Sequence, residues 1–272
     1  MKRKRKRKHT TTKKTRRAQG RQRSGGLSPA QLQHVAGTTT GELLQPTRLH
    51  YAIADPSQAE RILLNLECMD TDPPRQRWVW LYTQEAAHLA FQKHPTPQDG
   101  PVVIGEFCWN GPEELVLNAR SIERALAAVE FFDQCLPRTV AQLAHVTLIN
   151  RLFSVADTLQ IHSLHALFED TPLTEVDPDA LVEKLLTAKE HSQNAHQQES
   201  AIAQIIEELG QRPEPEMEKF PAYYYDEGID SLRLQLRTQQ AVAVQHWHGN
   251  TAYTKHDAIQ DMLQQSQQQT WE

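Results

Sequence analysis

Alternating apolar and polar positions predict a strand near the start of the patterned part of the chain. Leu49, Tyr51 and Ile53 recur with a period of two, which places their side chains on one face of a half-buried strand. A capping box at 57–60 then precedes apolar residues at helical spacing as far as Met69. The same reasoning predicts strands at 77–82, 102–109, 115–118 and 143–149, and helices at 83–93 and 121–136.

The order of these elements predicts an α+β fold. Asn110-Gly111 is a strong hairpin signal between two of the strands, so the order is strand, helix, strand, helix, hairpin, helix, strand. That order is close to a split β-α-β arrangement, in which helices cover one face of a mostly antiparallel sheet. We therefore expect residues 47–153 to form an α+β domain.

A helical segment is expected at 154–211. Residues 155–168 favour a helix, and the apolar residues of 181–186 share one face of a second helix. A polar stretch separates that helix from a third apolar face at 202–209, so the pair forms either an antiparallel hairpin or one long helix. Three prolines at 212–221 then indicate a linker or long loop, which we extend to residue 228.

The C-terminal region is expected to form a ββα unit at 229–263, a β-hairpin followed by a helix. Leu232, Leu234 and Leu236 alternate with polar residues, which is typical of a half-buried strand. Residues 242–248 provide its hairpin partner, and residues 257–263 a short helix. The Gln-rich tail at 264–272 is expected to be unstructured.

Charge divides the chain into two unequal parts. Residues 1–24 contain 13 Lys or Arg and no Asp or Glu. Residues 25–272 contain 16 basic and 34 acidic residues, a formal charge of −18. The net charge of −5 therefore conceals a cationic segment joined to an anionic one. Because their apolar content is low, residues 1–46 are expected to form a disordered basic arm.

Polyanions are the class of partner that this arm predicts. Lysine and arginine bind nucleic acids by releasing the counterions condensed on phosphates, an attraction that depends on salt and not on sequence. The arm has no Phe, Tyr or Trp, so we do not expect it to stack on bases. The predicted contacts to RNA or DNA are Lys2, Arg3, Lys4, Arg5, Lys6, Arg7, Lys8, Lys13, Lys14, Arg16, Arg17, Arg21 and Arg23.

Other uses of the arm compete with this hypothesis. The run from Lys2 to Lys8 is typical of a nuclear targeting signal if the source is a eukaryote, and basic runs also bind anionic lipid. The arm is also able to fold back onto acidic residues of the same chain, for example Glu214, Glu216 and Glu218.

His246 and His248 are the candidate metal ligands. Residues two apart on a strand point to the same face, so both imidazoles could reach one ion, with His256 or Asp257 completing the site. The competing interpretation is a strand end whose polar side chains face solvent, and it is favoured.

Aromatic residues form a candidate stacking surface. Trp78 and Trp80 point the same way on their strand, close to Trp109 on another, and single-stranded nucleic acids stack on such faces. A helix-covered sheet needs the same residues for its core, and that interpretation is favoured. Arg233 and Arg237 are a second candidate contact, with a solvated face as the favoured alternative.

Several other polar and thiol-bearing residues are expected to be structural. His162 and His165 lie three apart and are expected at the surface. Cys68, Cys108 and Cys135 are far apart in apolar surroundings, so we expect small buried hydrophobic residues in a reducing compartment.

The leading hypothesis is a non-enzymatic nucleic-acid-associated protein without a cofactor, whose acidic part binds a protein partner. The sequence holds no phosphate-binding loop, no G-x-S-x-G and no H-E-x-x-H. The alternatives are an interaction or regulatory module with a targeting arm, and a metal-dependent hydrolase or nuclease using His246 and His248. Without a signal peptide or an apolar run of about 20 residues, we expect a cytoplasmic or nucleoid-associated protein, or a nuclear one in a eukaryote.

Overall fold

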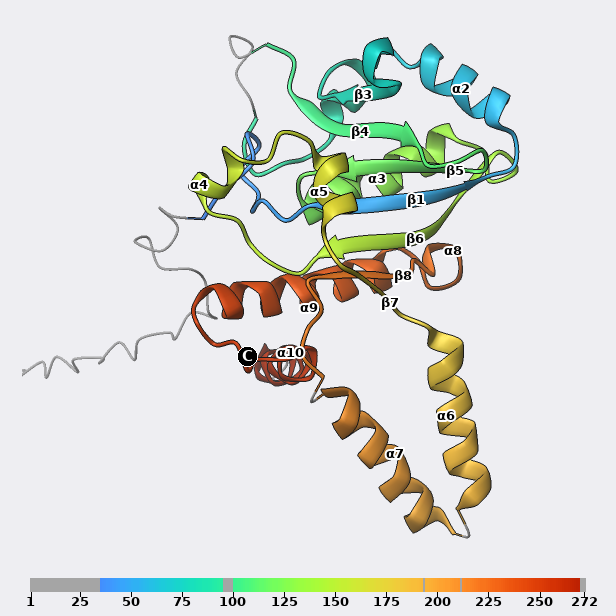
Figure 1. Ribbon diagram of the computed structural model, residues 1–272, viewed down its shortest axis with the longest axis vertical. Helices are drawn as coiled ribbons and strands as arrows, with labels where there is room; N and C mark the ends of the chain where they lie inside the picture. The colour runs from blue at the N-terminus through green and yellow to red at the C-terminus, as the bar shows by residue number, and fades with distance from the viewer. Residues whose placement is uncertain (1–34, 95–99, 193, 211, 270–272) are drawn as a thin grey trace, which may run out of the picture.

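The computed structural model describes residues 35–94, 100–192, 194–210 and 212–269, which we call the folded body. They form an eight-stranded sheet in the order β2-β3-β4-β5-β1-β6-β8-β7, with helices around it (Figure 1). Neighbouring strands are antiparallel except β7 and β8, which are parallel. The α+β class expected from the sequence is confirmed.

The elements of the folded body have the following bounds. The strands are β1 (Thr47–Ile53), β2 (Met69–Asp72), β3 (Arg77–Leu81), β4 (Val103–Trp109), β5 (Glu114–Ala119), β6 (Ala141–Ile149), β7 (Leu173–Glu175) and β8 (Met217–Pro221). The α-helices are α2 (Pro56–Asn65), α3 (Ile122–Cys135), α4 (Val155–Thr158), α5 (Leu164–Asp170), α6 (Pro178–His191), α7 (Ala195–Gly210), α8 (Tyr224–Glu227), α9 (Ile229–Trp247) and α10 (Lys255–Gln269). Two 3-10 turns, η1 (Pro73–Arg75) and η2 (Gln84–His88), complete the set.

The centre of the sheet has the split β-α-β arrangement expected at 47–153. Strand β5 lies between β1 and β4, and β6 pairs with the other edge of β1. Strand β2 is an addition that the sequence patterns do not predict. It pairs with β3, which pairs in turn with β4, so the two strands extend one edge of the sheet.

The main hydrophobic core lies on the face of the sheet that α3 covers. Phe132 of α3 packs against Trp80 and Phe107, with ring centroids 4.9 and 4.7 Å away. Full burial of each such ring contributes roughly 1.5–3 kcal/mol to stability. Gly105 permits this close packing, because a Cβ atom there would lie 2.8 Å from Leu117 Cδ1.

Residues 35–46 correct the boundary expected for the disordered arm. Ala36 is buried, and its backbone N–H donates to the Phe153 carbonyl at 2.7 Å. Thr40 Oγ1 accepts a hydrogen bond from Arg124 Nη2 at 2.7 Å, and Glu42 Oε2 lies 3.6 Å from Arg124 Nε. The Arg124 side chain is only 1% exposed, and a buried charge needs hydrogen-bond partners. Side-chain oxygens of residues 35–46 provide such partners, and this contact orders the segment.

The linker expected at 212–228 contains a strand of the central sheet. Strand β8 pairs with β6 in a register that runs from His145 opposite Pro221 to Ile149 opposite Met217. Phe220 is 1% exposed and belongs to the main core. The three prolines lie before the strand or at its last residue, where they interrupt few ladder hydrogen bonds.

The structure also corrects the ββα unit expected at 229–263. A single helix, α9, spans the residues of both expected strands, and α10 follows it. Leu232 and Leu236 lie one helical turn apart in the core, whereas Leu234 between them is 57% exposed. Three leucines are too few to distinguish a period of two from a helical period, and the Arg, Gln and Ala residues around them favour a helix. The glutamine run to Gln269 belongs to α10, and residues 270–272 lie outside the described part.

Helices α6 and α7 form the hairpin that was one of the two arrangements expected at 154–211. Figure 1 shows the pair projecting from the sheet, close together at their connection and further apart near β7 and β8. Asp177 caps α6, since its Oδ1 accepts from the backbone N–H groups of Asp179 and Ala180. Within the described ranges, every helix falls short of the length and apolar character of a membrane span.

Candidate functional site

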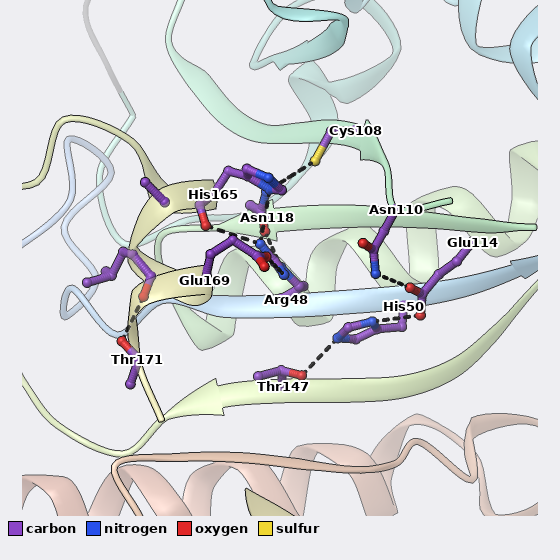
Figure 2. A network of polar contacts seen from close by, with 12 residues as sticks. Arg48, His50, Cys108, Asn110, Glu114, Asn118, Thr147, His165, Glu169 and Thr171 are labelled. Carbon is purple, nitrogen blue, oxygen red and sulfur yellow. Dashed lines mark hydrogen bonds and ion pairs between the residues drawn. The ribbon is translucent and has the colours of Figure 1, made fainter. Parts of the chain in front are cut away.

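A band of polar side chains crosses the face of the sheet opposite α3. It contains Arg48 and His50 of β1, Glu114 and Asn118 of β5, and Thr147 of β6 (Figure 2). Except for Glu114, each of these residues is at most 6% exposed. Buried polar groups need specific partners, so this polar band is where the fold holds its most constrained chemistry.

His50 lies at the centre of the polar band, between Glu114 and Thr147. Its Nδ1 is 3.0 Å from Glu114 Oε1, and its Nε2 is 2.8 Å from Thr147 Oγ1. A carboxylate only accepts, so a neutral imidazole donates from Nδ1 to Glu114 and accepts the Thr147 hydroxyl proton at Nε2. Burial lowers the pKa of His50 to about 4, against the opposing effect of Glu114, and the ring is neutral at pH 7.

A hydroxyl, an imidazole and a carboxylate in this order resemble the proton-transfer chain of a hydroxyl nucleophile. Access argues against that use, because Thr147 is 3% exposed and His50 is 5% exposed. A substrate does not reach the hydroxyl in this conformation. The three side chains therefore form hydrogen bonds across β5, β1 and β6, and these bonds satisfy polar atoms that are buried on the sheet.

Arg48 connects the sheet to α5. Its Nε donates to Asn118 Oδ1 at 2.8 Å and its Nη1 to Glu169 Oε1 at 2.9 Å. Its Nη2 lies 3.2 Å from His165 Nδ1, and the guanidinium stacks 4.4 Å from the centre of the Phe168 ring. A single arginine thus fixes a seven-residue helix over one end of the polar band.

Cys108 and His165 bring a thiol and an imidazole together at the edge of the polar band (Figure 2). Cys108 Sγ lies 3.6 Å from His165 Nδ1 and 3.7 Å from Asn118 Nδ2. Burial raises the pKa of the Cys108 thiol, although Arg48 and the Asn118 hydrogen bond act in the opposite direction. A reactive cysteine needs a lowered pKa, so this pair is not an activated nucleophile.

Ion pairs join β2, β3 and β4 at Arg77. Its Nε lies 2.9 Å from Asp72 Oδ2 and its Nη1 2.5 Å from Glu106 Oε2. Asp72 and Glu106 therefore both pair with the same arginine, which links the three strands at this edge of the sheet.

The residues predicted to bind nucleic acid lie outside the described residues, so the structure does not test them. They are Lys2 to Lys8, Lys13, Lys14, Arg16, Arg17, Arg21 and Arg23.

The strand geometry behind the His246 and His248 metal hypothesis is not present. His246 belongs to α9 and His248 ends it, and residues two apart on a helix point about 200° apart. His246 Nε2 donates instead to the Tyr253 carbonyl at 2.8 Å, and Asp257 Oδ2 accepts from the Thr254 N–H at 2.8 Å. Among the described residues, no group of three or more His, Cys, Asp or Glu is arranged to hold a metal ion.

The candidate tryptophan surface on β3 is part of the core. Trp80 is fully buried, which confirms the favoured interpretation. Trp78 packs edge-on against Trp109 at 6.3 Å, and Trp109 Nε1 donates to Glu60 Oε1 at 3.2 Å. Arg233 lies on α9, not on a strand, and pairs with carboxylates of α9 and α3.

The sequence patterns miss most of the polar band. Arg48 and His50 occupy the polar positions of a strand that was expected to face solvent on that side. No sequence pattern indicated Glu114, whose carboxylate pairs with His50. The sequence shows polar residues at alternate positions of three strands. Which of them become neighbours depends on the register of the strands, and the sequence pattern does not specify that register.

Comparisons with known proteins give no further guide. No family model matches the chain, and neither the curated proteins nor the solved structures include a significant match.

Proposed function

We propose that the protein associates with nucleic acid through its basic arm and binds a protein partner through its acidic folded body. The observation that carries this proposal is the separation of charge along the chain. Residues 1–24 hold 13 basic and no acidic residues, whereas residues 25–272 have a formal charge of −18. A phosphate backbone attracts the first segment and repels the second.

Ion pairing within the folded body strengthens this assignment. Eight of the 16 basic residues beyond the arm form ion pairs with carboxylates: Arg48, Arg75, Arg77, Arg124, Arg138, Lys219, Arg233 and Lys255. Their charges are already compensated, and a phosphate would have to displace a carboxylate to use them. The unpaired excess of charge on the folded body is negative, so attraction to phosphate rests on the arm.

Contacts of this kind hold a protein on RNA or DNA without choosing a sequence. The arm has no aromatic residue for base stacking, which supports the same conclusion. The proposed role is therefore an adaptor, in which the arm provides attachment and the folded body provides the specific contact.

The proposal is tested by fluorescence anisotropy with labelled RNA, single-stranded DNA and duplex DNA. We expect the full-length protein to bind all three at low salt, and a variant lacking residues 1–24 to lose binding to all of them. The deleted residues lie outside the described part, so every residue of the folded body is still present in the variant. Selective binding of one probe by the truncated protein would instead make the folded body the reader of nucleic acid. Absence of binding by the full-length protein would favour the alternative, an interaction module with a targeting arm.

A further inference from the structure

A groove opens between the projecting helical hairpin and the rest of the folded body. Its volume is about 600 Å³, and its walls come from α6, α7, α10 and the segments that flank β7 and β8. Helices α6 and α7 separate toward the sheet (Figure 1). Segments far apart in sequence therefore build one concave surface.

The floor of this groove is apolar and open to solvent. Val176, Ile206, Leu209 and Ile259 line it and are 41%, 50%, 37% and 47% exposed. Eight of the 14 large exposed hydrophobic side chains of the described residues lie in or beside β7, α6, α7 and α10. Such concentration of exposed apolar surface marks an interaction site and not ordinary surface scatter.

Charged residues of both signs surround this apolar floor, with acidic residues in excess: Glu175, Asp177, Glu208, Glu214 and Glu218 against Lys184, Arg212 and Lys255. Asp177 and Glu208 are exposed at the groove, and Glu214 and Glu218 are partly or fully buried in its wall. Lys255 pairs with the two carboxylates in the wall, since its Nζ lies 2.6 Å from Glu218 Oε2 and 3.4 Å from Glu214 Oε2. Lys184 and Arg212 are exposed in the same lining as Asp177 and Glu208, so the acidic excess comes from the lining and the hairpin taken together. The hairpin as a whole, residues 177–210, holds seven acidic and two basic residues.

We propose that this groove binds a basic amphipathic helix of a partner protein. The apolar face of such a helix covers the floor, and its Lys and Arg residues lie against the acidic rim. The inference rests on the partner-binding half of the proposed function and is independent of the arm's attachment to nucleic acid.

The sign of the charge favours a basic helix over the other possible ligands of the groove, which are a second copy of the chain, a nucleic acid and an anionic bilayer. A second copy of the chain would bring a second acidic hairpin against the first, and like charges juxtaposed at an interface oppose association. A nucleic acid or an anionic bilayer carries the same sign as the rim. A basic helix matches both the apolar floor and the charge.

The test uses the full-length protein and a fluorescent Leu/Lys peptide of about 18 residues with an amphipathic helical pattern. A peptide of identical composition in scrambled order is the probe control. We expect the patterned peptide to bind, and Ile206→Glu to weaken its binding at least about tenfold, as expected for a buried apolar anchor. The new carboxylate attracts a basic peptide, so such a loss reports apolar contact and not charge. Leu64→Glu, at a 60% exposed position on α2 outside the groove, is the matched control and should change affinity less than about twofold.

Three results would overturn the proposal. Equal affinity of Ile206→Glu and wild type would show that the peptide binds the acidic surface without the groove. A dimer in light scattering that Ile206→Glu abolishes would make a second copy the occupant, and binding to phosphatidylglycerol vesicles that this variant abolishes would make it a lipid. Far-UV circular dichroism of each variant checks that the hairpin remains folded. The assay contains no nucleic acid, so failure here leaves the arm's role intact, and failure of the arm leaves this result unchanged.

Discussion

Arg124 and His50 are two buried side chains whose charge state depends on the fold. Burial lowers the pKa of Arg124 to about 10, so the guanidinium stays charged at neutral pH, with Glu42 opposing the shift. Burial keeps His50 neutral instead. Arg124 thus needs a charged partner, whereas His50 must stay unprotonated. Both requirements affect the free energy of unfolding, which can be measured.

Removing the Arg124 charge should leave Glu42 buried without its cation. We expect Arg124→Met to lower the free energy of unfolding by roughly 3–5 kcal/mol, measured by urea denaturation. The double variant Arg124→Met, Glu42→Gln should recover part of that loss, because no uncompensated carboxylate then remains. A loss below about 1 kcal/mol for the single variant would show that the pair is not desolvated as described.

Stability should fall as the solution is acidified through the range set by His50. The folded pKa of about 4 is below the ordinary value of 6.5, so the unfolded chain binds the proton first as pH falls. Stability from His50 is therefore complete above pH 6.5 and is lost between about 6.5 and 4. Between pH 7 and pH 5 we expect a loss of roughly 2 kcal/mol from this residue in urea denaturation. His50→Gln cannot titrate, so its stability should depend less steeply on pH, and equal slopes would contradict the assignment.

At the scale of elements, the sequence predicts strands whose alternation is long and misses those that are short or rich in turn residues. β1 and β4 each have seven residues and were expected, whereas the four residues of β2 end in Asp72 before two prolines. α9 was mistaken for a hairpin, because Leu232, Leu234 and Leu236 fit both periods. Tertiary contacts favour the helix over the hairpin, because Leu232 and Leu236 pack into the core beside α3.

A proline at Leu234 tests the helical assignment of α9 directly. Position 234 is exposed and lies inside the helix, so Leu234→Pro should cost about 3 kcal/mol or more by removing a helical hydrogen bond. Leu234→Lys at the same exposed position should change stability by less than about 0.5 kcal/mol. Both are measured by thermal and urea unfolding. Similar stability of the two variants would be inconsistent with a continuous helix.

At the scale of the whole molecule, the sequence predicts features built from neighbouring residues and misses those built from residues far apart in the chain. The arm is contiguous, so composition alone indicated its partner class. The polar band joins Arg48, Glu114 and Thr147 through strand pairings that no local pattern specifies. The groove likewise brings together α6, α7 and α10, which are separate in sequence. The order of residues 35–46 was missed for the same reason, because Arg124, which contacts Thr40 and Glu42, lies far along the chain.

The central claim is that attachment to nucleic acid is an electrostatic property of the arm. The most direct measurement is the slope of log Kd against log salt concentration for duplex DNA, in the full-length protein and in a variant with residues 2–8 changed to glutamine. Each phosphate contact contributes about 0.9 to that slope, so we predict a steep salt dependence for the full-length protein and a clearly shallower one for the variant. A slope that is unchanged when these seven of the arm's 13 charges are removed would contradict the claim.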